Sequence, residues 1–317
     1  KIFFIGGSST GSTITINKLT LKNGGSGAGG AIYTGGTVTL NQCVLSNNSA
    51  PNGSGGAIDN LGTMTITNSI LSGNSAKYSG GAIFNRNAAN KKGLTIINST
   101  LSGNSATNTD GNGRGGGIYF SGNRLTIVNS TLSGNSASAL TCPTSQCSRG
   151  LGGGLYATWG TANDSMSVLD STFTGNAAAN VGGGIYLVGG TLKVGNSIVS
   201  GNNAPNGKEA AANNPASSSA KFASQGHNLF GENGADGLVN VTKAASDLVL
   251  PGVIGTALGP LANNGGPTKT HLPVAGSLAI NQGNNALIPA GVTTDQRGPG
   301  FPRIWPPLAQ NGKVDIG

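Results

Sequence analysis

Acidic residues are considered first, because carboxylates carry the chemistry of many enzymes and only a few occur in this chain. The 317-residue chain has 10 Asp and Glu, and residues 1 to 204 hold only Asp59, Asp110, Asp164 and Asp170. A glycosidase needs two carboxylates that face each other across the scissile bond, and a lyase needs a base and a way to neutralise the substrate's acid. Asp164 lies in a turn-like TANDS segment, and Asp170 stands where other repeats have Asn. We therefore expect structural roles for these residues and no enzymatic activity.

Histidine and cysteine offer no clearer catalytic or metal site. His227 and His271 lie in separate motifs, HNLFG and KTHLP, without nearby partners for a metal site or a triad. Cys142 and Cys147 are five residues apart, and we predict a local disulfide between them, which implies an oxidising, extracytoplasmic location. The remaining cysteine, Cys43, is interpreted as a small core or stacking residue. No cofactor and no metal are expected.

Composition restricts the fold class and the partners. Only 9% of residues are charged, 36% are hydrophobic and 56 are Gly, which excludes a helical bundle with charged faces. The formal net charge is +8, but the nearest approach to a basic cluster is Arg86, Lys91 and Lys92 in one expected loop. We interpret this loop as a solvated turn and expect no nucleic-acid partner. Weak attraction to an acidic polysaccharide or an anionic cell surface is the alternative. No apolar run is long enough for a transmembrane segment, and no signal-peptide core is present, so we expect a processed mature chain.

The polar and aromatic residues recur in a repeat. Each unit reads GGAI plus an aromatic residue, then an alternating run such as LTII, then a close on SGNSA. Successive closing Asn residues are 26, 30, 31, 41 and 26 residues apart, a period that marks a solenoid. The closing Asn residues, which we predict to form a structural ladder of amide hydrogen bonds, are Asn48, Asn74, Asn104, Asn135, Asn176 and Asn202. A second candidate ladder contains Asn68, Asn98, Asn129 and Asn196, with Asp170 as a substitute.

Three short strand-like pieces per unit are too short to pair within the unit, so they must pair with the same pieces of the next unit. The fold class is therefore predicted to be all-β: a right-handed parallel β-helix of triangular section with about ten coils. We divide the chain into an N-terminal strand and first coil (1–24), a repeat body (25–204), a loop insertion (205–225), and degenerate coils with an irregular C-terminal cap that closes the open end (226–317).

The position after the GGAI-type Ile is mostly aromatic. If the Ile points inward, this neighbour points outward and forms a stripe along one face. The stripe consists of Tyr33, Phe84, Tyr119, Tyr156 and Tyr186, with Asp59 in one coil. One interpretation is stacking that stabilises the sheet, with the hydroxyls in water. The other is a platform for sugar rings or a contact line for another subunit.

The N-terminal segment KIFFIGG is apolar and has no evident partner within the chain. Its Ile2, Phe3, Phe4 and Ile5 are candidates for an assembly strand that inserts into, or stacks on, the C-terminal region of a neighbouring molecule. Such a head-to-tail contact does not close and produces a fibre. The alternative is that this segment forms the first coil or pairs with the tail.

Two family resemblances follow from these motifs. The combination of GGAI with a hydrophobic-x-x-Asn motif, as in LSGN at Leu71 and FTGN at Phe173, resembles the repeats of chlamydial polymorphic outer membrane proteins over residues 17–204. Residues 225–317 resemble bacterial choice-of-anchor Q proteins through HNLFG, LGPLANNGGPTKTHLP, GSLAINQG, TDQRG and VDIG, in that order. That second resemblance implies secretion and display at a bacterial cell surface, followed by an anchor that this chain does not include.

These features predict an extracellular, surface-associated structural or adhesive protein. Its partners would be copies of itself, in a head-to-tail fibre, or a surface glycan. The alternative function is a carbohydrate-active β-helix, either a polysaccharide lyase or hydrolase or a glycan-binding module.

Overall fold

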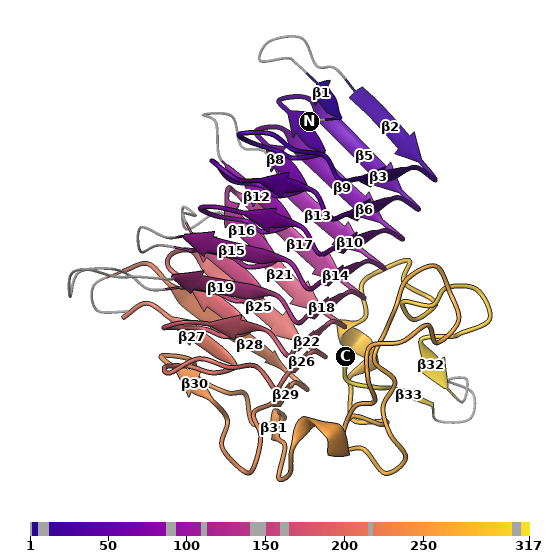
Figure 1. Ribbon diagram of the computed structural model, residues 1–317. Coiled ribbons are helices and arrows are strands. Elements are labelled where there is room, and N and C mark those ends of the chain that lie inside the picture. Colours follow the sequence, from indigo (N-terminus) through magenta and orange to yellow (C-terminus); the bar gives the residue numbers. More distant parts are fainter. Residues whose placement is uncertain are drawn as a thin grey trace.

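The computed structural model describes residues 2–5, 13–86, 93–108, 113–139, 150–158, 165–214, 218–305 and 312–317. Within these ranges the chain winds as a right-handed parallel β-helix, with a C-terminal segment packed against its side (Figure 1). None of the helices in the described part is long and apolar enough to cross a membrane.

Three long parallel sheets form the walls of the helix. Sheet A contains β1 (Phe3–Ile5), β4 (Ile32–Thr34), β8 (Ile58–Asn60), β12 (Ile83–Asn85), β16 (Ile118–Ser121), β20 (Leu155–Thr158), β24 (Ile185–Leu187), β27 (Ala210–Ala212) and β30 (Leu238–Val239). Sheet B contains β2 (Thr13–Asn17), β5 (Thr37–Asn41), β9 (Thr63–Thr67), β13 (Gly93–Ile97), β17 (Arg124–Val128), β21 (Ser165–Leu169), β25 (Thr191–Gly195) and β28 (Lys221–Gly226). Sheet C contains β3 (Thr20–Lys22), β6 (Val44–Ser46), β10 (Ile70–Ser72), β14 (Thr100–Ser102), β18 (Thr131–Ser133), β22 (Thr172–Thr174), β26 (Ile198–Val199), β29 (Leu229–Phe230) and β31 (Leu248–Val249).

A fourth, shorter sheet differs from the triangular section that the sequence predicts. Sheet D contains β7 (Ser49–Ala50), β11 (Ser75–Ala76), β15 (Ser105–Asn108), β19 (Ser136–Ala139) and β23 (Ala177–Ala178). Four of these strands begin with the Ser-Ala pair that closes each repeat, and β23 has two Ala residues in its place. Strands of two to four residues are too short to show a clear alternating pattern, so the sequence did not predict this sheet.

The core is a set of stacks along the helix axis. The register places Ile83 of β12 between Ile58 of β8 and Ile118 of β16, and all three side chains are fully buried. In sheet B, Ile66, Ile96 and Ile127 form a similar buried stack. Burial of one such side chain contributes about 1.5–3 kcal/mol, so the repeated apolar positions drive the coiling.

Glycine is required where one coil meets the next. Gly80 begins the GGAI corner with φ of 65°, and a Cβ there would lie 2.2 Å from the carbonyl oxygen of Ile83. A Cβ on Gly81 would lie 2.1 Å from the carbonyl oxygen of Gly116 in the next coil. No side chain fits at either position, so the Gly pairs follow from the tightness of this corner.

The segment predicted as a loop at 205–225 supplies two strands instead. Its Ala210–Ala212 pairs with β24 as β27, and β28 begins at Lys221. Alanine has low strand propensity, but pairing with β24 and β30 places Ala210 between Ile185 and Leu238 and continues sheet A. Tertiary context therefore overrides the local composition.

The C-terminal segment lies against the side of the β-helix and does not form the predicted cap on its open end. The segment HNLFGENGADGLVN does form part of a last coil through β29 and β30. The remaining described residues, which we call the tail (250–305 and 312–317), fold back along the outer face of sheet C (Figure 1). The tail carries two short 3-10 helices, η1 (Ile254–Thr256) and η2 (Asn285–Leu287), and a two-stranded antiparallel sheet of β32 (Ile304–Trp305) and β33 (Lys313–Val314).

Candidate functional site

The closing Asn residues form one continuous ladder of buried amides. Each Nδ2 donates to the Oδ1 of the Asn in the next coil at 2.8–3.0 Å, and each Oδ1 also accepts the backbone N–H of the preceding Asn. The second proton of each Nδ2 goes to a carbonyl of the preceding coil. The ladder runs through Asn48, Asn74, Asn104, Asn135, Asn176 and Asn202, all nearly inaccessible to solvent. It satisfies the polar groups of a buried turn, which is a structural role.

A buried carboxylate ends this ladder. Glu209 is 1% exposed, and its Oε2 accepts from the Nδ2 of Asn202 at 2.7 Å and from its backbone N–H at 3.1 Å. Its Oε1 accepts from the backbone N–H of Gly201. Burial raises the pKa of Glu209 to about 7, although these hydrogen bonds oppose the shift and the neighbouring Glu232 adds to it. Glu209 therefore takes the place of the next asparagine and can change its charge near neutral pH.

The second predicted ladder is present in two parts, with no hydrogen bond between the described side chains of Asn129 and Asp170, and a serine ladder accompanies it. Asn98 donates to Asn68, Asn129 to Asn98, and Asn196 to Asp170, through their side chains. These residues have φ near 50°, a left-handed conformation that Asn and Asp tolerate better than most residues. The next residue in each turn is a buried hydroxyl that accepts the backbone N–H of the preceding coil: Ser69, Ser99, Ser130, Ser171 and Ser197.

Cys43 occupies the serine position in an early coil. Its side chain is 1% exposed, and its Sγ lies 3.3 Å from the carbonyl oxygen of Ile16 and 3.5 Å from that of Asn41. Its backbone N–H donates to the hydroxyl of Ser69. The structure therefore places Cys43 in a packed turn, where a thiol replaces a hydroxyl. Cys142 and Cys147 lie outside the described residues.

The aromatic stripe lies on the outer face of sheet A. Its rings contact one another in different ways: Tyr119 and Tyr156 are stacked, Phe84 is tilted against Tyr119, and Tyr186 meets Tyr156 edge to face. Ring centroids are 4.8 Å apart for Phe84 and Tyr119, 5.0 Å for Tyr119 and Tyr156, and 5.8 Å for Tyr156 and Tyr186. A sugar platform needs free ring faces, whereas the stacked rings of Tyr119 and Tyr156 cover each other's faces. Tyr156 is only 5% exposed. The arrangement favours the stabilising interpretation of the stripe over the sugar platform.

Burial of the stripe changes the acidity of its phenols. It raises the pKa of Tyr156 to about 12 and also raises the pKa values of Tyr119 and Tyr186, while the positive charge of Arg114 acts in the opposite direction. The Arg114 guanidinium lies 5.7 Å from the centre of the Tyr156 ring. The hydroxyl of Tyr186 donates to the side chain of Asn213 at 2.7 Å. These phenols remain neutral at physiological pH.

Asp59 replaces an aromatic residue in the stripe, and Arg86 compensates for it. The Arg86 guanidinium forms two hydrogen bonds with the Asp59 carboxylate, at 3.0 and 3.1 Å. The same guanidinium lies 6.0 Å from the ring of Tyr33 and 5.7 Å from that of Phe84. The ion pair thus connects the two aromatic parts of the stripe. The Asp59 carboxylate is thus engaged in an ion pair within the stripe.

The tail binds sheet C through polar contacts. The Thr131 hydroxyl donates to the Gln296 side chain at 2.7 Å, and Gln296 donates to the hydroxyls of Thr100 and Thr268, both at 2.8 Å. The Thr100 hydroxyl donates to the carbonyl oxygen of Lys269 at 2.6 Å. Two tail motifs, TDQRG and GGPTKTHLP, therefore meet on adjacent strands of sheet C.

A buried ion pair holds the tail further along the same face. The Nη2 of Arg303 lies 3.0 Å from the Oδ1 of Asp170, with side-chain exposures of 6% and 0%. Arg303 also donates to the carbonyl oxygens of Gly317 and Asp315, so the VDIG motif joins the contact. Removal of one partner from a buried pair leaves an uncompensated charge, which makes this contact a strong determinant of tail docking.

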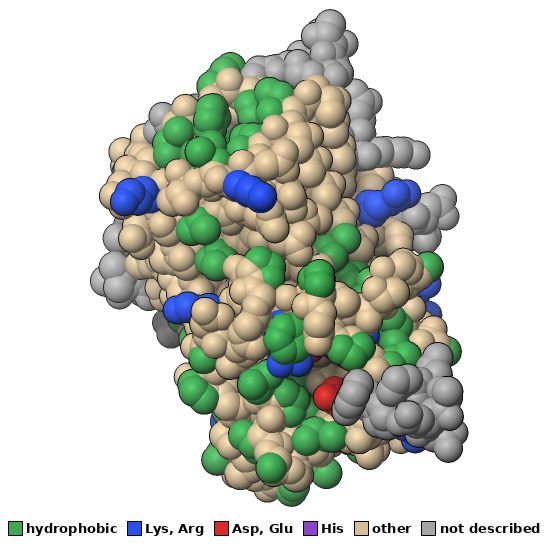
Figure 2. Space-filling model, turned by 90° about the vertical axis from the view of Figure 1, so that its right-hand side faces the viewer, with side chains coloured by type: hydrophobic (Ala, Val, Ile, Leu, Met, Phe, Trp, Pro, Cys, Tyr) green, Lys and Arg blue, Asp and Glu red, His purple; other side chains and the backbone are tan. Residues whose placement is uncertain are grey.

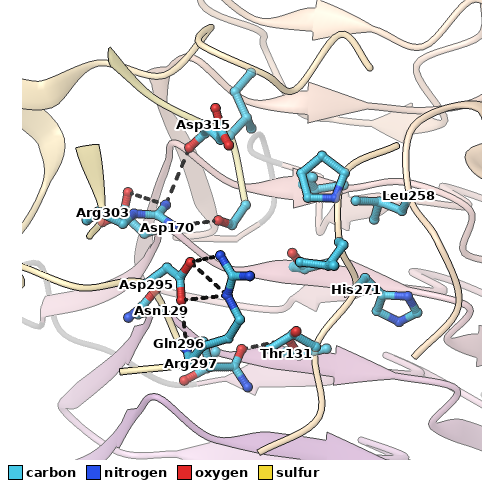
Figure 3. A pocket seen from close by; sticks show the side chains of 18 residues that line it. Asn129, Thr131, Asp170, Leu258, His271, Asp295, Gln296, Arg297, Arg303 and Asp315 are labelled. Carbon is cyan, nitrogen blue, oxygen red and sulfur yellow. Dashed lines mark hydrogen bonds and ion pairs between the residues drawn. The ribbon is translucent and has the colours of Figure 1, made fainter. Parts of the chain in front are cut away.

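A cavity of about 90 Å³ remains between sheet C and the tail (Figure 3). Its wall includes Asp170 and Arg303, the paired Asp295 and Arg297, and His271. His271 lies 3.0 Å from the hydroxyl of Ser133 and 2.7 Å from the carbonyl oxygen of Gly259, and burial lowers its pKa. This cavity is the candidate binding site of the described residues, because it combines a hollow with buried charged groups.

The remaining predicted residues are separated in space or fall outside the description. His227 lies at a turn, where its Nδ1 is 2.8 Å from the carbonyl oxygen of Gln282. Asp110 and Asp164 are outside the described residues. Within the described ranges, no group of three or more His, Cys, Asp or Glu residues is arranged to hold a metal ion.

The candidate assembly strand forms the first strand of sheet A. Phe3, Phe4 and Ile5 pair in parallel with Ile32, Tyr33 and Thr34, and the Phe4 ring stacks on Tyr33 at 5.4 Å. This is the alternative in which the segment belongs to the first coil of its own chain. Ile2, which precedes the strand, is 42% exposed.

Sequence reasoning missed three residues that shape these sites: Glu209, Gln296 and Arg303. Glu209 carried a usable signal, because it stands at the third position of the GGAI motif, which is Ala or Gly in the other coils, as at Ala82. Arg303 carried none, because its partner Asp170 is 133 residues away in sequence. Only the folded chain brings them together.

Comparison with known families supports the repeat. Residues 68–86 and 170–187 match the Chlamydia polymorphic membrane protein repeat. Each match contains a closing Asn (Asn74 or Asn176) and an aromatic stripe residue (Phe84 or Tyr186). The chain is therefore similar to chlamydial polymorphic membrane proteins, which indicates a bacterial outer-membrane or cell-surface protein. The match does not extend to residues 225–317, so the choice-of-anchor Q resemblance stays a prediction. No curated protein and no solved structure matches the chain.

Proposed function

We propose that this chain is a non-enzymatic structural and adhesive module displayed outside a bacterial cell. The similarity of its repeat to that of chlamydial polymorphic membrane proteins carries the proposal. The repeat residues that this match covers have structural roles: the Asn ladder satisfies a buried turn, and the rings of the stripe contact one another. A rigid rod with few charges is suited to holding a binding surface away from the cell.

Absence of catalysis is part of this proposal. The described repeat-body acids, Asp59 and Asp170, are each engaged by an arginine at 3.0 Å. Both carboxylates are engaged in ion pairs, whereas glycosidases use two carboxyl groups that face each other across the scissile bond. Incubation of the purified chain with uronic-acid polymers and neutral glycans is expected to release no product. Time-dependent formation of unsaturated or reducing ends would favour the carbohydrate-active alternative.

Adhesion is tested with the purified chain itself. Fluorescently labelled chain is expected to bind saturably to cells or to immobilised cell-surface glycans, and unlabelled chain is expected to compete. The control is a heat-unfolded sample at the same concentration, which measures nonspecific adsorption. If native chain adsorbs no more than the control on cells and on glycans, the adhesive function is wrong.

End-to-end association of copies is a second candidate function. Sheets A, B and C end in β1, β2 and β3 on one side and in β30, β28 and β31 on the other, so a second copy would continue all three sheets. Ile14 and Leu19 are 36% and 37% exposed at the first end, and Val239 is 39% exposed at the other. Figure 2 shows hydrophobic side chains gathered at the N-terminal end of the molecule.

Electron microscopy of the chain with and without residues 1–7 tests this association. Filaments that appear with increasing concentration and disappear on deletion or in Ile14→Lys would support stacking. Light scattering that reports a monomer at all concentrations in all three samples would eliminate it. Because β1 already pairs with β4, the contact tested is stacking of complete coils.

A further inference from the structure

The outer face of sheet B carries two regular columns of hydroxyl groups. In β9, Met64 and Ile66 are buried and point into the core, so Thr63 and Thr65 point outward by strand alternation. The strands β2, β5, β13, β17 and β21 alternate in the same way and continue the same register. The central column consists of Thr15, Thr39, Thr65, Thr95, Thr126 and Ser167, and the column beside it consists of Thr13, Thr37, Thr63, Gly93, Arg124 and Ser165.

Strand propensity alone does not account for the composition of these columns. Outward strand positions also favour Val, Ile and Tyr, and protein surfaces commonly carry many charged residues. Ten of the twelve column positions are nevertheless Thr or Ser, and the exceptions are Gly93 and Arg124. Sheet A presents aromatic rings on its outer face instead. The hydroxyl columns are therefore specific to one face of the solenoid.

The hydroxyls of the central column do not hold the protein together. In the third outward column of sheet B the polar side chains bond one another: Asn41 donates to Asn17 at 3.2 Å, and Thr67 donates to Asn41 at 3.1 Å. Among the described residues, the hydroxyls of the central column form no hydrogen bond of this kind. Their side chains are exposed or half-buried. Each hydroxyl therefore keeps its donor and its acceptor sites for a partner outside the chain.

The tail leaves these columns open. Its contacts beside sheet B are with the turns that follow the strands, as between Asn284 and Asn196 and between Thr294 and Asn129. Figure 1 shows the strands of sheet B side by side, with the tail lying against sheet C.

The sheet holds the hydroxyls in a fixed two-dimensional lattice. Neighbouring strands lie about 4.8 Å apart, and side chains two residues apart along one strand are separated by about 6.6 Å. The register is unbroken from β2 to β25, and a shift occurs only where β25 pairs with β28. Thr is β-branched and restricted at χ1, so it loses little side-chain freedom when it binds a partner.

The chemistry of this lattice indicates its partner. The two columns carry no charge in β2, β5, β9 and β13, which disfavours an ionic polymer. They also lack the aromatic and large apolar side chains that form the core of protein interfaces. A rigid, neutral array of hydroxyl and methyl groups is complementary to another neutral lattice of hydrogen-bond donors and acceptors. Ice is such a lattice, and the oxygen repeats on the prism face of hexagonal ice are close to both spacings of the columns.

We propose that the outer face of sheet B binds ice, through a layer of water that the hydroxyl columns order. Water held between regularly spaced hydroxyls has already lost part of its freedom, so its incorporation into the crystal costs less entropy. Bound chain then hinders growth of the crystal surface between the attached molecules. This function goes beyond the adhesive function proposed above and does not depend on it.

Two substitutions block the central column in different coils. Thr65→Tyr and Thr95→Tyr each place a bulky ring at an outward position, and Tyr has high strand propensity, so both variants are expected to fold. The matched control is Thr20→Tyr, because Thr20 is an exposed, outward residue of β3 in sheet C. It adds the same ring to a different face. Circular dichroism and guanidinium unfolding verify the fold of all three variants.

Ice binding is measured as the gap between the melting and freezing temperatures of a single crystal in a solution of the purified chain, and as labelling of a growing crystal by fluorescent chain. Wild type and Thr20→Tyr are expected to open this gap, to shape the crystal and to label its surface. Thr65→Tyr and Thr95→Tyr are expected to lose most of both effects. Absence of a gap and of labelling in wild type, or equal activity in all three folded variants, would overturn the proposal.

Other occupants of the face would be revealed by the same variants. A wild-type dimer that dissociates in Thr65→Tyr, without activity on ice, would mean that two copies pack face to face. Adsorption to crystalline cellulose or chitin that Thr65→Tyr abolishes, again without activity on ice, would mean that the face binds a solid glycan. Either result overturns ice binding. The adhesion assay with cells and glycans is run above the freezing point, so the adhesive function succeeds or fails independently.

Discussion

Replacement of Asn104 by Ala in the middle of the amide ladder is the sharpest test of how the coils hold together. The Asn104 side chain makes four buried hydrogen bonds, two as acceptor from the backbone N–H and Nδ2 of Asn74 and two as donor to Leu71 and Asn135. Asn104→Ala removes all four. The N–H of Asn74 and the carbonyl oxygen of Leu71 then lose their side-chain partner at a site with no access to water.

The magnitude follows from the groups that lose their partners. Each buried polar group left unsatisfied costs about 1–3 kcal/mol, so two such groups give a loss of about 4 kcal/mol in the free energy of unfolding. Asn104→Asp is expected to be at least as harmful, because it keeps the acceptor, loses both donated hydrogen bonds and buries a carboxylate. Because each coil contacts mainly its neighbours, the loss falls on the two interfaces that Asn104 joins.

The matched control is Asn47→Gly. Asn47 is exposed, has φ of 54°, and stands where the following coils have Gly73, Gly103 and Gly134. We expect a change within about 0.5 kcal/mol. Guanidinium unfolding followed by circular dichroism measures both variants, with hydrogen exchange to locate the weakened coils. An Asn104→Ala protein that unfolds at the same denaturant concentration as Asn47→Gly would refute the ladder as a source of stability.

Three further predictions concern charged and phenolic groups. The pKa of Glu209 is about 7 in the folded chain against an ordinary value of 4.5, so the folded state holds the proton more tightly than the unfolded state does. The free energy of unfolding is therefore expected to fall by up to about 3 kcal/mol as pH rises from about 4.5 to above 7. Glu209→Gln should flatten this pH dependence in thermal melts, and an unchanged slope would contradict the assignment. Arg303→Ala is expected to release the tail from sheet C, because it leaves Asp170 buried without its partner. Trypsin should then cut within residues 250–317 faster in this variant than in the control variant Lys313→Ala. The circular dichroism signal of the β-helix should be the same in both. Spectrophotometric titration should find a phenol that stays protonated beyond about pH 11, and this phenol should be missing from the titration of Tyr156→Phe. If Tyr156→Phe instead lacks a phenol that titrates near pH 10, Tyr156 is exposed to water.

The repeat could be predicted from sequence because its signals are local and recur. Gly80 and Gly81 mark a corner that admits no side chain, Ile83 marks an inward position, and Asn74 marks a buried turn. Each of these signals can be recognised within a single repeat, and its recurrence in the other repeats supports the same fold. The same logic identified the outward stripe, although its rings cover one another more than the alternation indicated.

The tail and its cavity could not be predicted in this way. TDQRG and VDIG are visible motifs, but nothing near them in sequence says that Gln296 meets Thr131 or that Arg303 meets Asp170. Side chains of irregular segments obey no period, so their partners are set by how the chain folds back. The expected cap failed for this reason: composition indicated an irregular terminal segment without indicating which face it covers.

The amino-acid sequence by itself therefore determined the parallel β-helix, its coil period and its Asn ladder. The reason is that short repeated strands can bury their apolar side chains only by pairing with the same strands of the next repeat. Only the tertiary structure decided that Glu209 ends the ladder and that the tail lies along sheet C. It also decided that a polar cavity lies between the tail and sheet C beside Asp170. Those features depend on contacts between residues far apart in the chain, and such contacts leave no periodic trace in the sequence.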